Sequence, residues 1–456
     1  MESPPRDGQV SAEPTGSALV SRTCELPEHA AQTTRAFLAS RESPRIFWAS
    51  PYGPELAGGG TAARITADGS DRFDEIRAAA ADLFAGLDYD GPDLARPRLF
   101  GGFAFHDSHR AAPPWRGFPG ATFLLPRMQL VRADGEAWLT VSARDSAPEE
   151  VEAALENAKR SIEGSSPSGA SASDAPDGEP PGVVGTEPTT SREEWAEQVR
   201  AAVERIRGGE LSKVVIAQAL AATLEAPVSV PDALERLGES YPDCFRFFVE
   251  PTAEAGFFGA TPERLTTLRG RTVETEALAG SVGRGGTPEE DAELEASLRE
   301  SEKMIHEHEL VGRTIRDQLA PLAGEVRVGD RRVRKLANIQ HLWTPIEADL
   351  AVDDHVLSIV EALHPTPAVG GVPPSAALDA IRETETFDRG WYAAPVGWFD
   401  AAGDGTFAVG LRSGVAESDR VTLFAGNGIV GDSDPDAEYE EVQLKYRPIL
   451  DELERR

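Results

Sequence analysis

The stretch Leu211-Ser-Lys-Val-Val-Ile-Ala-Gln218 places one lysine directly before a short, continuously apolar and β-branched run. Such a run is typical of a buried strand, so we expect the Lys213 amine at the edge of a core and not free in solvent. A lysine held in this way is a candidate for chemistry, for example as a base. The ordinary alternative is a lysine whose stem covers apolar surface while its ammonium reaches water.

Three more clusters of ionisable residues follow this lysine. They contain Glu263 in GATPER, Glu307 in SEKMIHEHEL, and Glu438, Glu441 and Lys445 after the glycine-rich turn GNGIVGD. The last three residues are spaced i, i+3 and i+7, which places them on one face of a helix. Taken alone, a helical cluster of this kind is more often a surface ion pair worth a few tenths of a kcal/mol than a metal site.

The acidic residues favour magnesium over zinc. His306, Glu307 and His308 are adjacent, so their side chains point to different faces of a helix, and the H-E-x-x-H spacing of a zinc site is absent. Carboxylates on separate helices, without cysteine, are the oxygen ligands that Mg²⁺ prefers. We therefore expect Mg²⁺ as the cofactor of any metal site here.

The composition limits the possible partners. The 456 residues include 45 basic and 77 acidic side chains, a formal net charge of −32. A phosphate backbone or an anionic membrane needs a basic footprint, so this balance argues against nucleic acid and membrane as partners. Only five lysines occur. An acidic, lysine-poor surface is expected of a halophilic protein, because salt screens its self-repulsion.

The cysteines and the first residues predict a soluble, cytoplasmic protein. Cys24 and Cys244 are too few for a disulfide framework, which fits a reducing compartment. The chain begins without the basic and then apolar order of a signal peptide, and no apolar run approaches the ~20 residues that span a bilayer.

The order of patterns predicts an α+β fold with antiparallel sheets, because short hairpin-linked strands are mixed with helices. Ser191 and Glu194 have the spacing of a capping box, and their helix should end at Gly208. One continuous helix is expected over about 287–319 and a hairpin over 326–338. The predicted organisation is a disordered terminus over 1–20, an N-terminal part over 21–163, a low-complexity linker over 164–190 and a catalytic part over 191–456.

Several motifs together resemble the chorismate-utilising enzymes of the anthranilate synthase component I type, and most closely the isochorismate synthases. In chain order they are KVVIAQ, GATPERL, ALAGS, SEKMIHEHELV, HPTPAVGG, GWYAAPVGW, GLRSG and AGNGIV with EYEEVQLK. The resemblance implies a four-layer α/β/β/α fold to which both parts contribute. It also implies Mg²⁺-dependent conversion of chorismate to isochorismate for menaquinone or siderophore synthesis, by a monomer or homodimer without a glutamine amidotransferase subunit.

The resemblance implies a role for each candidate. Lys213 would be the base that takes a proton from water attacking C2 of chorismate, and Glu263 the acid that protonates the departing C4 hydroxyl. The Mg²⁺ ligands would be Glu307 and Glu441, helped through water by Glu438. The groups that position the substrate or line its pocket would be Gly280, Ser281, His341, Ala368, Arg412, Gly426 and Lys445.

These roles agree with simple electrostatics. Chorismate is a dianion, and a protein of net charge −32 must gather positive charge locally to bind it. A lysine base must be partly neutral and a carboxylic acid must stay protonated, so the pair needs an environment that shifts the two pKa values in opposite directions.

Three positions separate the isochorismate synthases from related enzymes. Anthranilate synthases usually carry Gln at the position of Lys213, aminodeoxychorismate synthases a lysine at that of Ala279, and salicylate synthases usually Thr at that of Ala368. All three residues favour isochorismate as the product. A salicylate synthase is the alternative enzyme, and an inactive acidic binding or scaffold protein is the alternative from another class. Gln218 departs from the family, which often has Arg there.

Overall fold

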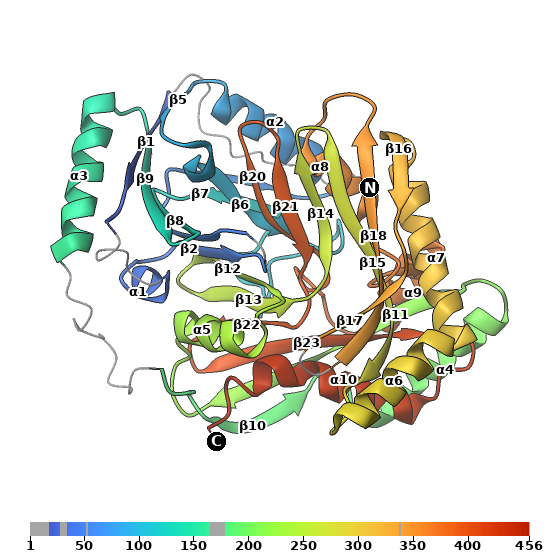
Figure 1. Ribbon diagram of the computed structural model, residues 1–456. Helices are drawn as coiled ribbons and strands as arrows, with labels where there is room; N and C mark the ends of the chain where they lie inside the picture. The colour runs from blue at the N-terminus through green and yellow to red at the C-terminus, as the bar shows by residue number, and fades with distance from the viewer. Residues whose placement is uncertain (1–17, 28–33, 52, 165–177, 337–338, 456) are drawn as a thin grey trace, which may run out of the picture.

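The computed structural model describes residues 18–27, 34–51, 53–164, 178–336 and 339–455. Helices and strands are mixed along the whole chain, and the helices lie on the outside (Figure 1). The helices are α1 (Thr34–Ala39), α2 (Arg72–Phe84), α3 (Pro148–Gly164), α4 (Arg192–Arg207), α5 (Val230–Ser240), α6 (Pro288–Glu300), α7 (Glu302–Leu319), α8 (Val356–Leu363), α9 (Pro374–Thr384) and α10 (Pro435–Leu450), with a 3₁₀ turn over Asp93–Ala95.

Two large sheets form the body of the protein. The described residues of the first sheet make 13 strands, in the order β10 (Val183–Pro188), β11 (Lys213–Leu224), β23 (Arg420–Ile429), β22 (Ser413–Glu417), β13 (Ala255–Thr261), β12 (Phe245–Thr252), β2 (Arg45–Ala49), β3 (Glu55–Gly59), β8 (Met128–Ala133), β9 (Glu136–Arg144), β1 (Leu19–Glu25) and β5 (Leu87–Asp90), with β19 (Gly371–Val372) also paired to β11. Those of the second make ten, in the order β16 (Ala323–Val328), β18 (Ile339–Leu350), β15 (Thr272–Gly283), β14 (Arg264–Arg269), β21 (Gly405–Val409), β20 (Pro395–Asp400), β6 (Arg98–Phe103), β7 (Ala121–Leu125) and β4 (Ala63–Ala67), with β17 (Arg332–Lys335) also paired to β18.

Nearly all neighbouring strands run antiparallel; among the described pairs only β1 and β5 are parallel. The predicted α+β class with antiparallel sheets is therefore confirmed. Helices α7 and α6 pack on β15 and β18, while α10 and α4 pack on β23 and β11, so helices cover the outer faces of both sheets (Figure 1). This is the four-layer α/β/β/α arrangement.

Residues from both halves of the chain share each sheet. In the first sheet β2 pairs with β12, so that Phe47 lies opposite Phe248. In the second, β6 pairs with β20, so that Phe100 lies opposite Trp398. The N-terminal and C-terminal parts therefore build both sheets together, with aromatic side chains paired across the boundary.

Two of the places where the chain crosses from one sheet to the other lie side by side. Strand β13 of the first sheet continues through Glu263 into β14 of the second, and β21 of the second continues through Arg412 into β22 of the first. The crossings are hydrogen-bonded to each other, since Val409 N donates to Glu263 O at 3.1 Å and Ala260 N to Arg412 O at 3.1 Å. Two ionisable side chains, those of Glu263 and Arg412, are thereby held where the sheets meet.

Two predicted boundaries are wrong. Leu19 and Val20, assigned to a disordered terminus over 1–20, are buried in β1, whereas residues 1–17 of that prediction lie outside the described residues. The linker predicted over 164–190 contains β10, and residues 165–177 lie outside the described part. Strand β10 is mostly exposed and pairs with β11 through its backbone, so it lacks the apolar alternation by which a strand is found.

Two predicted elements also need correction. The helix expected over 287–319 is two helices, because Ser301 adopts an extended conformation and its hydroxyl caps α7 by accepting from Met304 N. The hairpin expected over 326–338 does not form, since β16 and β17 each pair with β18 and not with each other. The capping box of Ser191 and Glu194 is confirmed, and α4 ends at Arg207.

Candidate active site

Lys213 is the first residue of β11 and is 4% exposed. Its Nζ donates to Glu307 Oε1 on α7 at 2.7 Å. Gly428 lies alongside on β23, where a Cβ would come within 2.7 Å of Lys213 Cε. Because Gly428 has no side chain, the Lys213 side chain can occupy this space. The buried amine expected from the sequence is therefore present, and the solvent-exposed alternative is wrong.

Glu263 lies at the crossing from β13 to β14 and is 7% exposed. Burial, and next the charge of Glu276, raises the pKa of the Glu263 carboxyl to about 8, although a hydrogen bond from Thr366 and the charge of Lys213 act in the opposite direction. Thr366 Oγ1 donates to Glu263 Oε1 at 3.4 Å. A carboxyl group in this environment keeps its proton at neutral pH and can donate it.

Helix α10 carries three candidates that meet the end of β23. Lys445 Nζ lies 3.0 Å from Glu441 Oε1 and donates to Gly426 O at 3.1 Å and to Asn427 Oδ1 at 2.8 Å. The Asn427 amide donates to Glu438. Burial raises the pKa of Glu438. Burial acts in the same direction on Glu441, but Lys445 and Asn427 outweigh it, and the pKa of Glu441 is lowered.

The three carboxylates proposed from the sequence as metal ligands have suitable chemistry but do not surround an ion. Glu307, Glu438 and Glu441 offer only oxygen atoms, which suits Mg²⁺. Within the described ranges, however, no group of three or more His, Cys, Asp or Glu side chains is close enough to hold a metal. Glu307 is paired instead with the Lys213 ammonium. The raised pKa of Glu438 indicates that added positive charge would be favourable there.

A second group of candidates presents unpaired polar atoms. Ser281 Oγ and His341 Nδ1 lie 2.7 Å apart, across the register of β15 and β18. Burial and the charges of Arg412, Lys445 and Arg334 lower the pKa of His341 well below 6.5, so its ring is neutral. In the described part of the chain, the buried atoms His341 Nε2 and Arg412 Nη1 have no hydrogen-bond partner. Buried polar atoms without a partner need a ligand or water.

Backbone geometry at two candidates is unusual. Gly280 has a φ of +74° and lies where the pairing of β15 with β18 shifts register, a bulge that suits glycine. Arg412 has a φ of +46°, which is uncommon for a residue with a side chain. Ala368 lies in the turn after α8, two residues beyond Thr366. Its methyl group makes no polar contact, so its pocket-lining role stays a prediction.

A buried ion pair supports the strand that begins with the candidate base. Glu385 and Arg389 have side-chain exposures of 3% and 0%. Arg389 Nη2 donates to Val215 O at 2.8 Å and Nη1 to Val369 O at 2.9 Å, while Ala217 N donates to Glu385 Oε1 at 2.8 Å. Strand β10 pairs with β11 only from Leu220 onward. The ion pair therefore takes the place of a neighbouring strand on the part of this edge of β11 that lies between β19 and β10.

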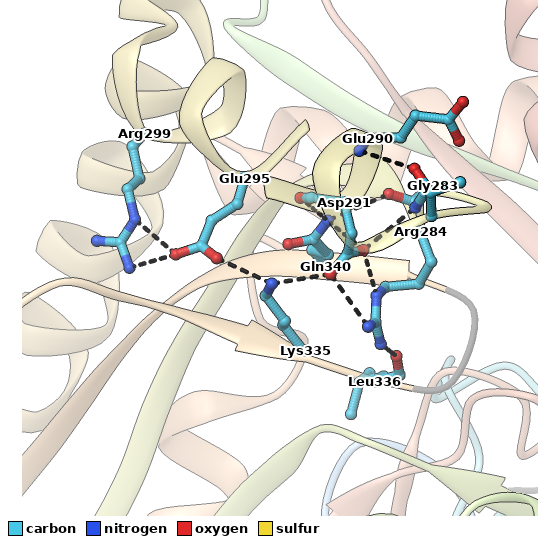
Figure 2. Close-up of polar contacts among 11 residues, drawn as sticks. Gly283, Arg284, Glu290, Asp291, Glu295, Arg299, Lys335, Leu336 and Gln340 are labelled. Atoms are coloured by element: carbon cyan, nitrogen blue, oxygen red, sulfur yellow. Dashed lines mark hydrogen bonds and ion pairs between the residues drawn. The ribbon is translucent and has the colours of Figure 1, made fainter. Parts of the chain in front are cut away.

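An ionic network fixes the ends of the two strands that carry Ser281 and His341 (Figure 2). Asp291 of α6 accepts from Arg284 Nε at 2.6 Å, from Lys335 Nζ at 2.8 Å and from Gln340 Nε2 at 3.1 Å. Arg284 follows β15, Lys335 ends β17 and Gln340 lies in β18. These charge-assisted bonds join α6 to three strand ends beside the site.

Comparison with known proteins agrees with this geometry. A family model described as "Chorismate binding enzyme" matches residues 9–454. The salicylate biosynthesis isochorismate synthase of Pseudomonas aeruginosa is 38% identical over 418 residues, covering 91% of this chain and 85% of the relative. Isochorismate synthase MenF of Bacillus subtilis is 36% identical, covering 78% and 74% of the two chains. The chain belongs to the isochorismate synthases of the chorismate-binding enzyme family.

Solved structures place this isochorismate synthase family member in the same fold group. The menaquinone-specific isochorismate synthase MenF of Escherichia coli is similar with a TM-score of 0.81 and 26% identity over 97% of each chain. Anthranilate synthase component I of Streptococcus pneumoniae has a TM-score of 0.71 at 19% identity, over 98% and 95% of the chains, which shows the shared fold alone. No described helix has the length and apolarity to cross a membrane.

Sequence reasoning missed several polar residues of the site. Thr366, Glu276 and Asn427 lie inside the motifs HPTPAVGG, TEALAGS and AGNGIV, but nothing local distinguishes them from structural polar residues. Gln218 was noted only as a departure from the family. It is fully buried in β11, and neither of its amide atoms has a hydrogen-bond partner within the described ranges.

Proposed function

We propose that the chain converts chorismate to isochorismate with Mg²⁺, by adding water at C2 and releasing the C4 hydroxyl. The observation that carries the proposal is a pair of buried groups at one site. The pKa of Glu263 is raised to about 8, and the charge of Lys213 acts on this carboxyl. Lys213 is 4% exposed. A protonated acid near a buried amine is the arrangement that general acid–base chemistry requires.

In the proposed reaction the uncharged form of Lys213 Nζ accepts a proton from water and becomes the ammonium, while the water oxygen forms a bond to C2. The electron pairs of the two ring double bonds each shift by one position toward C4. The C4–O bond breaks, its electron pair stays on the oxygen, and Glu263 donates its proton to that oxygen. One water is consumed and one is released, so the reaction is an isomerisation and needs no oxidant or ammonia.

The substrate carboxylates would be held by the donors that lack partners. Arg412 Nη1 and His341 Nε2 are buried and unpaired within the described residues. A bound anion would satisfy both when His341 carries its proton on Nε2 and accepts from Ser281 Oγ at Nδ1. Lys445 adds a cation at the end of β23. Ser281 orients the imidazole through its 2.7 Å contact.

Glu307, Glu438 and Glu441 would hold Mg²⁺. When bound, the ion would supply positive charge for the ring carboxylate. Calorimetric titration of Mg²⁺ tests this assignment apart from turnover: Glu307→Gln and Glu441→Gln should abolish binding, whereas Glu309→Gln, which removes an exposed α7 carboxylate paired with Arg331, should not. Equal affinity in all four proteins would contradict it.

Incubation with chorismate and Mg²⁺, without glutamine or ammonia, tests the reaction and the expectation that no amidotransferase subunit is needed. The expected product is isochorismate. Sustained release of pyruvate would identify a salicylate synthase instead, and absence of any turnover would favour the inactive scaffold.

The pathway is either menaquinone or siderophore synthesis. In support, one relative is named as menaquinone-specific and another as an enzyme of salicylate biosynthesis. Complementation of strains that lack one or the other isochorismate synthase distinguishes them.

A further inference from the structure

Glu276 is a buried carboxylate that the reaction described above does not use. It lies in β15 and its side chain is 5% exposed. It accepts three hydrogen bonds, from Trp343 Nε1 at 2.8 Å, from Arg334 Nη1 at 3.1 Å and from Arg264 N at 3.2 Å. A buried charge with this many donors is held in one orientation.

Two of these donors belong to the backbone and side chains around Glu263. Arg264 N is the amide that directly follows Glu263, so Glu276 binds the peptide on one side of it. Arg334, the ion-pair partner of Glu276, also donates to Pro262 O at 3.4 Å on the other side. The pair formed by Glu276 and Arg334 therefore clamps the short segment that crosses between the sheets at Glu263.

The charges that face Glu263 come from several elements. Glu276 on β15 adds a negative charge, while Lys213 on β11 adds a positive charge and Thr366 after α8 donates a hydrogen bond. Tyr392 also lies within electrostatic reach. Burial and Glu276 act together to raise the pKa of Glu263 to about 8, against Lys213 and Thr366. Among the named neighbours, only the Glu276 charge opposes loss of the proton.

We propose that Glu276, clamped with Arg334, is a positioning residue that aims the Glu263 carboxyl at the substrate and keeps its proton available for the departing hydroxyl. The proposal rests on the assignment of Glu263 as the general acid. Glu276 itself touches no reacting atom. It acts through the backbone on both sides of Glu263 and through its charge.

The test is the pH dependence of kcat for Glu276→Gln. Loss of the charge favours ionisation of Glu263, so the fall of kcat on the alkaline side should move to lower pH by one unit or more, with the KM for chorismate changed less than about threefold. Glu276→Asp keeps the charge and should retain the wild-type alkaline limb even if kcat falls. An alkaline limb in Glu276→Gln that superimposes on that of the wild type overturns the proposal.

Glu274→Gln is the matched control, because Glu274 lies two residues away on the same strand, pairs with the Arg264 side chain and is 41% exposed. Its pH profile should be that of the wild type, and a shift equal to that of Glu276→Gln overturns a specific role for Glu276. Glu263→Gln distinguishes failure of the acid assignment of Glu263 from failure of the positioning role of Glu276. Full activity of Glu263→Gln refutes the acid assignment, whereas an inactive Glu263→Gln with an unshifted Glu276→Gln refutes only the positioning role. If Glu276→Gln does not fold, Arg334→Lys replaces it: a wild-type ratio of kcat to KM in that variant overturns the clamp.

Discussion

Lys213 Nζ and Glu307 Oε1 are 2.7 Å apart, and this contact joins the first residue of β11 to the second turn of α7. The proposed base is thus ion-paired with a proposed metal ligand. The pair is largely shielded from water, with side-chain exposures of 5% and 20%, and each partner compensates the charge of the other.

Replacing Lys213 by glutamine should reduce kcat by about 10²–10⁴-fold, the range expected for loss of a general base. The amide is similar in length and can still donate to Glu307, so the far-ultraviolet circular dichroism spectrum should be unchanged. Lys303→Gln is the control, since Lys303 is an exposed lysine of α7 paired with Asp432, and its kcat should match the wild type. Wild-type turnover in Lys213→Gln would refute the base assignment.

Glu263→Gln should stabilise the protein at alkaline pH. The pKa of Glu263 is raised from 4.5 to about 8 in the folded protein, so its contribution to stability is complete below pH 4.5 and is lost as the pH rises through 8. Glutamine carries no charge and suffers no such loss. At about 1.4 kcal/mol per pH unit, the variant gains at most roughly 5 kcal/mol over the wild type.

Urea unfolding at pH 5 and pH 9 measures this difference. The free energy of unfolding of Glu263→Gln relative to wild type should increase between the two values. Glu254→Gln, in an exposed turn, should show no such change. A difference that stays constant with pH would mean that the Glu263 carboxyl is not held protonated by its surroundings.

The elements that depend on local signals could be predicted from the sequence. The capping box of Ser191 and Glu194 begins helix α4, and the apolar run after Lys213 forms strand β11, so both predictions are confirmed. Both patterns reflect interactions within a few residues of the chain. Strand β10 could not be found in this way, because its stability comes from backbone pairing with β11 and not from its own exposed side chains.

The candidate residues of the site could be identified from the sequence, but the contacts between them could not. Glu263 and Arg412 are 149 positions apart in the sequence and are brought together by pairing of the two crossings. The clamp formed by Glu276 and Arg334 likewise depends on the register of β15, β18 and β17. Such contacts follow from tertiary pairing, which no local pattern of residue types encodes.

Gln218→Met should leave activity unchanged and raise the free energy of unfolding by about 1–2 kcal/mol. Both amide atoms of Gln218 are buried without a hydrogen-bond partner among the described residues, which costs about 1–3 kcal/mol, and methionine has a similar volume. Gln340→Met is the control, because the buried Gln340 amide bonds to Asp291 and its removal should destabilise. Destabilisation of Gln218→Met would reveal a partner for this amide.

We propose that the acidic surface adapts the protein to high salt. At a net charge of −32, self-repulsion weakens as ionic strength rises, because the Debye length falls from about 10 Å at 0.1 M to about 3 Å at 1 M. The melting temperature should therefore rise between 0.1 M and 2 M KCl. Full stability and activity at low salt, with no further gain, would contradict this proposal.

Arg389→Lys should lower both stability and kcat. Arg389 donates at once to Glu385, to Val215 O and to Val369 O from a side chain with no exposed surface. A lysine keeps the charge but cannot make these bonds in the same geometry. Each lost hydrogen bond from this charged group costs about 1.5–3 kcal/mol, and Val215 lies two residues after Lys213. The expected result is therefore a lower melting temperature, with kcat reduced more than KM is changed.

Arg382→Lys is the matched control for this last variant. Arg382 ends α9 on the surface and pairs with Asp107, both about half exposed at 44% and 45%, so its replacement should change stability by less than about 1 kcal/mol. If the edge of β11 depends on the buried pair, Arg389→Lys will lose turnover and Arg382→Lys will not. Glu385→Gln, which keeps an acceptor for Ala217 N, will have a kcat between those of the two arginine variants. A folded Arg389→Lys with wild-type kcat would show that the position of Lys213 is set by β19 and β23 without the ion pair.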